Sequence, residues 1–258
     1  MRVRGTVEYL GTNWAGWQLQ PGVPTIQGEI ERAIRVVMKS GVRVSAAGRT
    51  DAGVHASGQV ISFELPDGTD LSKLCLSLNA LTDRSITIVD LVAASADFDP
   101  RRHAVSRSYE YTIVNSRPPS PFLIDRSWHL QRPLDLALLE RLAAAIVGEH
   151  DFAAFRAADC ESNSSRRRVT ASEWLADGPV LTYRVTANAF LKQMVRTLVG
   201  SMVDAAVGKL EERVFLELLA GGSRTAAGRT APAAGLTLVC VEYPEIDRTQ
   251  AGPADFQE

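Results

Sequence analysis

Segments of two periodicities alternate along this chain of 258 residues, and their order occurs twice. Apolar residues at every second position predict strands, whereas apolar residues three or four apart predict helices. In the first half these patterns give strand, helix, strand, strand, helix, strand over residues 2–10, 24–39, 42–46, 59–65, 71–81 and 86–92. This order is typical of a split βαβ unit, in which helices cover one face of a sheet.

The second half repeats the order without obvious sequence identity. Strands are predicted over 107–114, 169–175, 180–188 and 236–243, and helices over 134–147, 190–207 and 212–220. In the helix at 190–207, an apolar stripe is expected from Phe190, Met194, Leu198 and Met202. The polar stretch 156–168 and the proline-rich stretch 118–121 are predicted to be loops.

We therefore predict an α+β fold made of two split βαβ halves, similar to ferredoxin or RNA-recognition domains. The mixed antiparallel sheets are expected to form one continuous sheet with helices on its back and an active-site cleft between the halves. The predicted domains are residues 1–97 and 98–246, followed by a tail over 247–258 with few apolar residues.

Composition narrows the class of protein. Hydrophobic residues make up 45% of the chain and charged residues 22%, as in ordinary globular proteins. The three cysteines are odd in number and widely separated, which disfavours a disulfide framework or zinc site and favours a reducing cytoplasm. No apolar run reaches the roughly 18 residues of a membrane span, and no apolar signal region follows the first residues.

Arginine dominates the basic residues. Only four of the 28 basic residues are lysines, which leaves 24 arginines, although the net charge is −2. Arginines cluster at Arg101, Arg102 and Arg107, and again at 166–168. The planar guanidinium suits recognition of phosphates and bases, so these clusters are candidate RNA contacts. A general compositional bias toward arginine explains them equally well.

The stretch Gly48-Arg49-Thr50-Asp51-Ala52-Gly53-Val54-His55-Ala56 carries the most specific signal. Its glycines allow positive φ and close approach by another molecule, so Asp51 can be presented to a ligand. Arg49 can bind phosphate or keep Asp51 ionised, and an ionised carboxylate is a nucleophile. The alternative is an ordinary turn, in which the aspartate side chain bonds only to nearby backbone.

These nine residues resemble the signature of the tRNA pseudouridine synthase A family, whose nucleophilic aspartate falls on Asp51. The resemblance extends to Ser106-Arg107-Ser108-Tyr109-Glu110-Tyr111, where it implies that Tyr109 stacks on the target uracil. It extends also to the segment 188–196, where it implies that Arg196 pairs with Asp51, and to 231–238, where Leu236 would pack against the extruded base. The other interpretations are two tyrosines filling a sheet face, a solvated helical arginine and an ordinary strand start.

The chain departs from the family at Phe98-Asp99-Pro100-Arg101, where members usually carry Phe-His-Ala-Arg. Phe98 and Arg101 are kept, so only a role for the missing histidine is in doubt. The four histidines have no metal-ligand spacing, and there is no nucleotide-binding loop. We therefore expect neither a metal nor a cofactor.

The resemblance implies an isomerase that converts uridine to pseudouridine at positions 38, 39 and 40 of the anticodon stem-loop of transfer RNA. It also implies a homodimer in which one subunit docks the RNA and the other modifies it. Arg49 would fill the gap left by the extruded base, and the substrate would be held by Tyr109, Leu236, Arg101, Arg107, Arg166, Arg167 and Arg168. Two other functions fit the residues, namely a glycoside or nucleoside hydrolase and a non-catalytic RNA-binding module.

Overall fold

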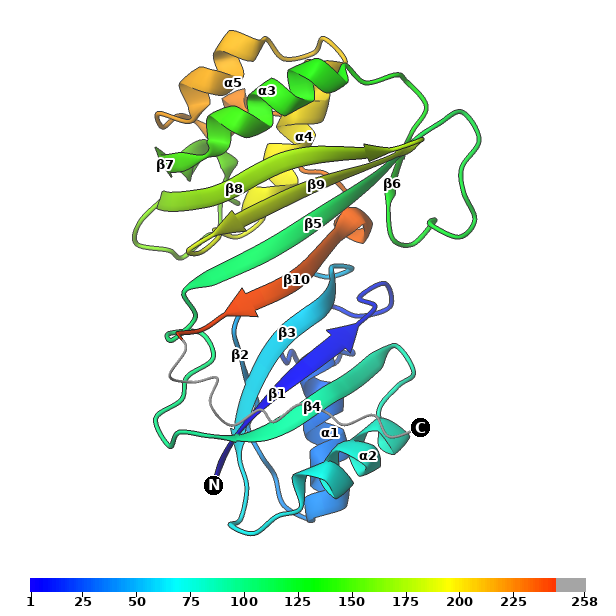
Figure 1. Cartoon of the computed structure of the whole chain (residues 1–258), viewed down its shortest axis with the longest axis vertical. Coiled ribbons are helices and arrows are strands. Elements are labelled where there is room, and N and C mark those ends of the chain that lie inside the picture. The colour runs from blue at the N-terminus through cyan, green and yellow to red at the C-terminus, as the bar shows by residue number, and fades with distance from the viewer. Residues whose placement is uncertain (245–258) are drawn as a thin grey trace. The chain divides into compact units, whose positions relative to one another are not determined.

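Figure 1 shows the computed structural model, which describes residues 1–244. The chain divides into two units, one comprising Met1–Val105 with residues 240–244, the other Ser106–Val239. The final strand, β10 (Leu236–Glu242), therefore begins in the second unit and ends in the first. The predicted functional division at residue 97 stays a prediction, and the predicted tail lies outside the described residues.

The first unit has three antiparallel strands in the order β4-β1-β3 and two helices (Figure 1). A short strand, β2, pairs with β3. In chain order the elements are β1 (Arg2–Tyr9), α1 (Ile26–Met38), β2 (Ser45–Ala46), β3 (His55–Glu64), α2 (Leu71–Leu81) and β4 (Ile86–Ala94). The order predicted from the sequence is confirmed. β3 begins earlier than predicted, so the end of the candidate signature is already in the strand.

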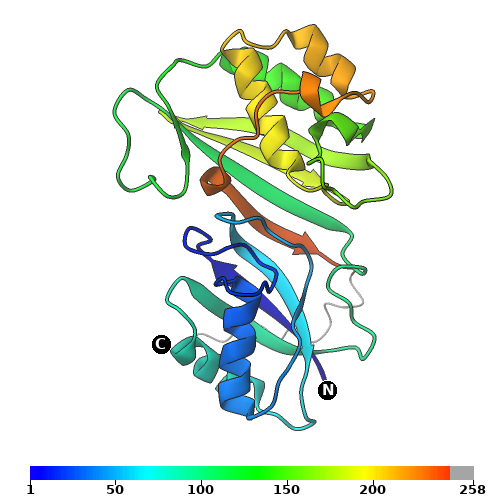
Figure 2. The ribbon, with the colours of Figure 1, turned by 180° about the vertical axis from the view of Figure 1, so that it is seen from behind.

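Helix α1 shows how the sequence sets one of these elements. The Thr25 side chain accepts a hydrogen bond from the Gly28 backbone N–H and caps the helix start. Ile26, Ile30 and Ile34 are fully buried beneath it. The helix ends at Met38 because Lys39 is left-handed, with φ 56°. Figure 2 shows α1 lying across one face of the strands.

In the second unit the antiparallel strands have the order β5-β9-β8-β7, and β6 pairs in parallel with β5. Its elements are β5 (Ser106–Asn115), β6 (Trp128–Leu130), α3 (Leu136–Ile146), β7 (Gly148–Asp151), β8 (Arg166–Asp177), β9 (Val180–Ala187), α4 (Met194–Ala206) and α5 (Glu212–Leu218). Short 3-10 helices lie at Phe152–Phe155, Arg224–Ala226 and Ala233–Gly235. β6 and β7 were not predicted, because three or four residues are too few to show a periodicity.

Two predictions in this unit are wrong. Helix α4 begins at Met194 rather than residue 190, because Gln193 has a left-handed φ of 61° and the Asn188 side chain accepts from the Ala189 N–H instead. Phe190 therefore lies outside the helix and its predicted stripe. Residues 166–168, predicted as loop, form the start of β8 and pair with β7.

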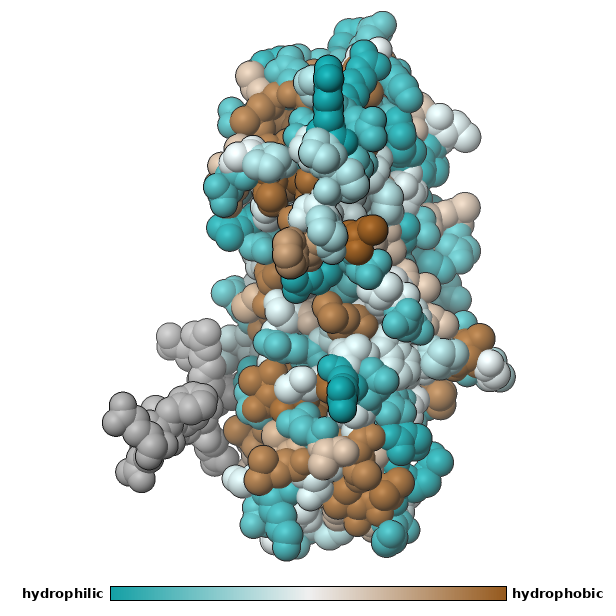
Figure 3. Space-filling model, turned by 90° about the vertical axis from the view of Figure 1, so that its right-hand side faces the viewer, coloured by the Kyte–Doolittle hydropathy of each residue, from teal (hydrophilic) through white to brown (hydrophobic). Residues whose placement is uncertain are grey.

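The α+β class and the two units of strands and helices are confirmed. The continuous sheet and the cleft between the units stay predictions. Among residues 1–244, no helix is both long and apolar enough to cross a bilayer. On the face drawn in Figure 3, hydrophilic side chains separate smaller groups of hydrophobic ones.

Candidate active site

The loop that carries Asp51 is held by backbone hydrogen bonds on both sides. The Trp17 N–H donates to the Thr50 carbonyl at 3.0 Å, and the Val54 N–H donates to the Asp51 carbonyl at 3.1 Å. The second bond closes a turn in which Gly53 has a φ of 78°, a conformation that favours glycine. Asp51, the first residue of this turn, is half-buried. Its main chain is thus fixed before any ligand binds.

Side chains beneath the loop anchor it further. The Tyr9 hydroxyl and Thr50 Oγ1 share a hydrogen bond of 2.8 Å, and Gln59 Nε2 donates to the Gly48 carbonyl at 2.7 Å. Burial raises the pKa of Tyr9 to about 12, although its hydrogen bonds with Thr50 and Gln59 act to lower it. The phenol therefore stays neutral and keeps its hydrogen bond throughout the neutral pH range.

The segment between β1 and α1 packs directly against this loop. Gly16 has a φ of 96°, and a Cβ added there would lie 2.9 Å from the Thr50 carbonyl oxygen. A Cβ added to Gly11 would lie 2.0 Å from the Val54 carbonyl oxygen. The Gly11 N–H also donates to Nδ1 of the buried His55 at 3.0 Å. Glycine is therefore required at these two positions so that the backbone of this segment can pack against the backbone of the Asp51 loop.

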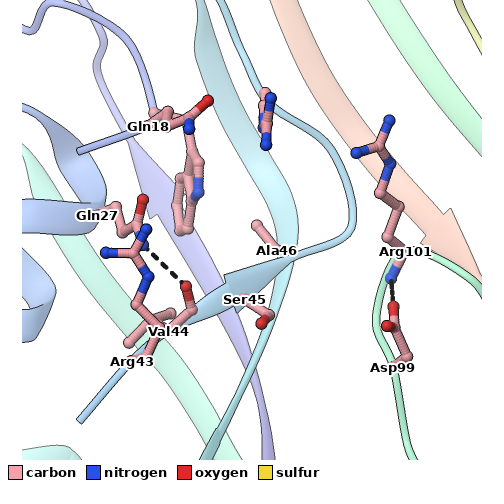
Figure 4. A pocket seen from close by; sticks show the side chains of 10 residues that line it. Gln18, Gln27, Arg43, Val44, Ser45, Ala46, Asp99 and Arg101 are labelled. Carbon is pink, nitrogen blue, oxygen red and sulfur yellow. Dashed lines mark hydrogen bonds between the residues drawn. The ribbon is translucent and has the colours of Figure 1, made fainter. Parts of the chain in front are cut away.

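Arg49 and Arg101 line one pocket of the first unit. Figure 4 shows this pocket, with Arg101 labelled. The divergent residues 99 and 100 have structural roles beside it. The Asp99 carboxylate accepts from the Arg101 and Arg102 N–H groups, and the Pro100 carbonyl accepts from the Tyr243 hydroxyl. Although burial acts to raise it, the pKa of Asp99 is lowered by these backbone hydrogen bonds from Arg102 and Arg101. The Asp99 side chain thus stabilises the turn that carries Arg101.

In the second unit, Arg196 lies in the first turn of α4, because this helix begins later than predicted. Its Nε donates to the Ala231 carbonyl at 2.8 Å, and its own carbonyl accepts from the Ala231 N–H at 3.0 Å. Burial raises the pKa of Tyr111 above its ordinary range, while the positive charge of Arg196 acts to lower it. Arg196 is therefore a half-buried, positioned guanidinium beside an aromatic ring, not a solvated surface charge.

The tyrosines of β5 have different environments. Tyr111 is fully buried and donates to the Pro232 carbonyl at 2.8 Å. Tyr109 is half-buried and meets Phe190 edge-on, with ring centroids 5.0 Å apart. Leu236, 6% exposed, begins β10 directly after Gly235, where an added Cβ would lie 2.5 Å from the Tyr111 ring.

Comparison with known proteins decides the family. Residues 142–244 match the family model described as tRNA pseudouridine synthase. The chain is 39% identical over 260 residues to tRNA pseudouridine synthase A of Myxococcus xanthus, covering 100% of this chain and 98% of that relative. It is 40% identical to the protein of that name from Geotalea uraniireducens (strain Rf4), covering 94% and 99%, and 41% identical to that from Moorella thermoacetica, covering 92% and 98%.

The chain belongs to the tRNA pseudouridine synthase A family. It is therefore an isomerase that acts on uridine in transfer RNA, and both rival functions, the hydrolase and the non-catalytic binding module, are set aside. Within the described residues, no group of three or more histidine, cysteine, aspartate or glutamate side chains could hold a metal ion. The individual site residues stay predictions, and Asp51 and Arg196 belong to different units of the fold.

The predicted RNA-contacting arginines of the second unit differ in burial. Arg107 is 9% exposed and donates to the Asn188 carbonyl at 2.9 Å. Arg166 and Arg168 are exposed, whereas Arg167 between them is half-buried and donates to Ser162 Oγ. Burial lowers the pKa of Arg167. Arg107 and Arg167 thus make contacts that order loops of this family member, and Arg166 and Arg168 are the ones that face solvent.

Sequence reasoning missed the residues that hold the candidate ones in place. Tyr9, Gln59 and Gly16 support the Asp51 loop, and the backbone of Ala231 holds Arg196. Gly16 lies between Trp14 and Trp17, and a glycine among tryptophans was a signal for close packing that could have been used. A backbone carbonyl has no signature in residue type, so the contact from Ala231 could not be found this way.

Proposed function

We propose that this chain isomerises uridine to pseudouridine at positions 38, 39 and 40 in the anticodon stem-loop of transfer RNA, with Asp51 as the nucleophile. The proposal is supported above all by the loop in which Asp51 stands. The main chain that carries the Asp51 carboxylate is fixed by two hydrogen bonds, one from the Trp17 N–H to the Thr50 carbonyl and one from the Val54 N–H to the Asp51 carbonyl. A nucleophile held in place before binding loses little freedom in the reaction, and this lowers the barrier.

The reaction needs no redox step or energy source. The N1–C1′ bond of the nucleotide breaks, the uracil turns, and a C5–C1′ bond forms. Asp51 either adds to C6 of the uracil or captures C1′ of the ribose, as carboxylates do in sugar chemistry. In both routes the C5 hydrogen leaves to solvent as a proton, N1 gains a proton, and the carboxylate is regenerated.

The remaining candidates act on the base and on the charge of Asp51. The uracil must leave the RNA stack, at a cost of a few kcal/mol, and Arg49 is proposed to fill the gap. Tyr109 and Leu236 are proposed to sandwich the base, and Tyr109 is also proposed to transfer a proton. Arg196 is proposed to pair with Asp51, which favours the ionised carboxylate. The hydrogen bond from its Nε to the Ala231 carbonyl fixes the guanidinium, which supports a role that depends on the orientation of this group as well as on its charge.

The decisive experiment measures hydrogen release from C5-tritiated uridine in unmodified transfer RNA. The wild type should release tritium from positions 38–40, whereas Asp51→Asn should bind the same RNA with unchanged affinity and release none. The substitution keeps size and hydrogen bonding, so lost turnover points to lost nucleophilicity. Tritium release by Asp51→Asn at a rate near that of the wild type would refute the assignment.

We also propose that the enzyme works as a homodimer in the cytoplasm, with one subunit docking the RNA that the other modifies. The proposal follows from the family resemblance. Light scattering of the active enzyme tests it, because a monomer that turns over at full rate would contradict it.

A further inference from the structure

The first unit has a pocket of about 230 Å³ directly beside the Asp51 loop. Its floor is the stretch 43–46 with strand β2, and opposite walls are formed by the segment around Gln18 and the turn around Arg101 (Figure 4). Typical small-molecule sites measure about 300–1,000 Å³ and are mostly apolar. This pocket is smaller, and its lining is rich in arginine, glutamine and serine. It therefore suits a small polar group better than a base or a cofactor.

The pocket is built on a buried framework. Gln27, only 3% exposed, accepts from the Leu19 N–H and donates to the Val44 carbonyl, so it joins the wall, α1 and the floor. Gln27 also donates to the 6% exposed Glu31, which accepts from the Val44 N–H. Because every one of these contacts is internal, the pocket has its shape without a ligand.

The charge of the lining is positive. Arg43, Arg49 and Arg101 line the pocket together with a single carboxylate, Asp99. Asp99 already accepts from two backbone N–H groups, and Arg43 lies 3.7 Å from Glu31 while its side chain is 64% exposed. Several guanidinium groups around one small polar hollow are the usual arrangement for a phosphate, since each offers a planar fork of donors.

A chain of backbone hydrogen bonds joins the pocket to the Asp51 loop. Trp17, which lines the pocket, donates its N–H to the Thr50 carbonyl and accepts at its own carbonyl from the Gln27 N–H. Arg49 stands two residues before Asp51 and lines the same pocket. A group bound here would therefore lie next to the proposed nucleophile along one continuous, ordered stretch.

We propose that this pocket binds a phosphodiester group of the RNA strand that carries the target uridine. The inference rests on the proposed function, and it adds Arg43, Gln18 and Ser45 to the substrate contacts. Holding a phosphate here anchors the RNA strand next to the Asp51 loop. The pocket thus contributes to RNA binding, and takes no part in bond making.

The test compares Arg43→Gln with Arg35→Gln, which removes the same charge from an exposed position on α1 outside the pocket. Binding of unmodified transfer RNA is measured at several salt concentrations, together with tritium release. Arg43→Gln should raise KM about tenfold with kcat unchanged and reduce the slope of log K against log salt by about one. A second variant, Ser45→Asp, should weaken binding at least as much, because it places a negative charge in the pocket.

Arg35→Gln sets the size of a non-specific charge effect. If Arg43→Gln and Ser45→Asp match it in both KM and salt slope, the phosphate site is refuted. Failure of the proposed function has a different signature, because the wild type would then release no tritium. The salt slopes would still report on the pocket in that case. Circular dichroism of each variant confirms that it is folded before its binding is compared.

Discussion

The pentapeptide Ala-Ala-Gly-Arg-Thr occurs once in each unit, at 46–50 and at 226–230, and its two copies hold candidate residues in opposite ways. In the first unit it leads directly into Asp51, so the loop itself presents the reactive group. In the second unit it leads into Ala231, whose backbone holds Arg196 on the neighbouring helix. The first copy leads into a candidate residue, Asp51, whereas the second leads into the backbone that holds a candidate residue on another element, Arg196.

The partners of each copy explain the difference. Thr50 bonds to the Tyr9 hydroxyl, and Arg49 is one of the residues that line the proposed phosphate pocket. In contrast, Arg229 pairs with Asp204 on α4, and Thr230 accepts from Arg224. Identical local sequence therefore did not give an identical environment. The residues opposite each loop decide its role.

Both loops depend on a facing glycine, and substitution there should have the largest effect. A Cβ at Gly200 would lie 1.9 Å from the Arg229 carbonyl oxygen, so Gly200→Ala must displace backbone. We expect Gly200→Ala to lower the free energy of unfolding by about 3 kcal/mol or more. Gly16→Ala should lower it by about 2 kcal/mol, because its positive φ strains an alanine while the contact of its Cβ is less close. Denaturant titration measures both.

Gly41→Ala is the matched control, since an added Cβ there would meet no atom within 4 Å. It should change the free energy of unfolding by about 0.5 kcal/mol or less. A Gly200→Ala variant as stable as Gly41→Ala would show that the clamp on α4 is loose. The contrast between the two copies would then lose its structural basis.

Arg196→Lys separates the charge of this residue from its position. Lysine keeps the positive charge but cannot reproduce the Nε–H bond to the Ala231 carbonyl. We expect turnover to fall about 100-fold, equivalent to about 2.7 kcal/mol, with RNA affinity within about twofold of the wild type. Single-turnover tritium release and filter binding measure the two effects.

The control for this substitution is Arg213→Lys on α5, where the arginine is exposed and pairs with Glu217. It should leave turnover unchanged. If Arg196→Lys also turned over at the rate of the wild type, positive charge alone would suffice. The loop at 226–231 would then be a structural element without influence on the chemistry.

The fold of the first unit was predictable because its elements, apart from the two-residue β2, carry a clear periodicity over several residues. Helix α2 was predicted at its observed bounds, with its start capped by Asp70. The start of α4 was predicted wrongly. The apolar periodicity is strong enough to extend the helix toward residue 190, but the left-handed Gln193 and the Asn188 side chain prevent it from starting there. Local hydrogen bonding overrode periodicity there.

The candidate residues were predictable only through resemblance, since aspartate before a turn or tyrosine on a strand is common in any fold. Their supports were not predictable, because they act through backbone atoms or across long sequence separations. Tyr9 meets Thr50 across 41 residues, and Arg196 meets Ala231 across 35. Nothing in the composition of either segment indicates its partner.

The arginines at 166–168 should show the smallest effects, and they contrast with the pocket arginines of the first unit. A strand directs successive side chains to opposite faces, so Arg166 and Arg168 share one face and Arg167 takes the other. Arg166→Gln and Arg168→Gln should each reduce the salt slope of RNA binding by about one, with stability nearly unchanged. Arg167→Gln should leave the slope unchanged.

For Arg167→Gln the cost is expected in stability instead. Its guanidinium donates to Ser162 Oγ and to the Ser164 carbonyl, which orders the loop before β8. Loss of these bonds should lower the free energy of unfolding by about 1–2 kcal/mol. Salt titrations and denaturant titrations of the three variants, run in parallel, measure both quantities. An Arg167→Gln salt slope reduced as much as those of its neighbours would show that β8 opens to bind RNA, because only then could all three guanidinium groups reach phosphates together.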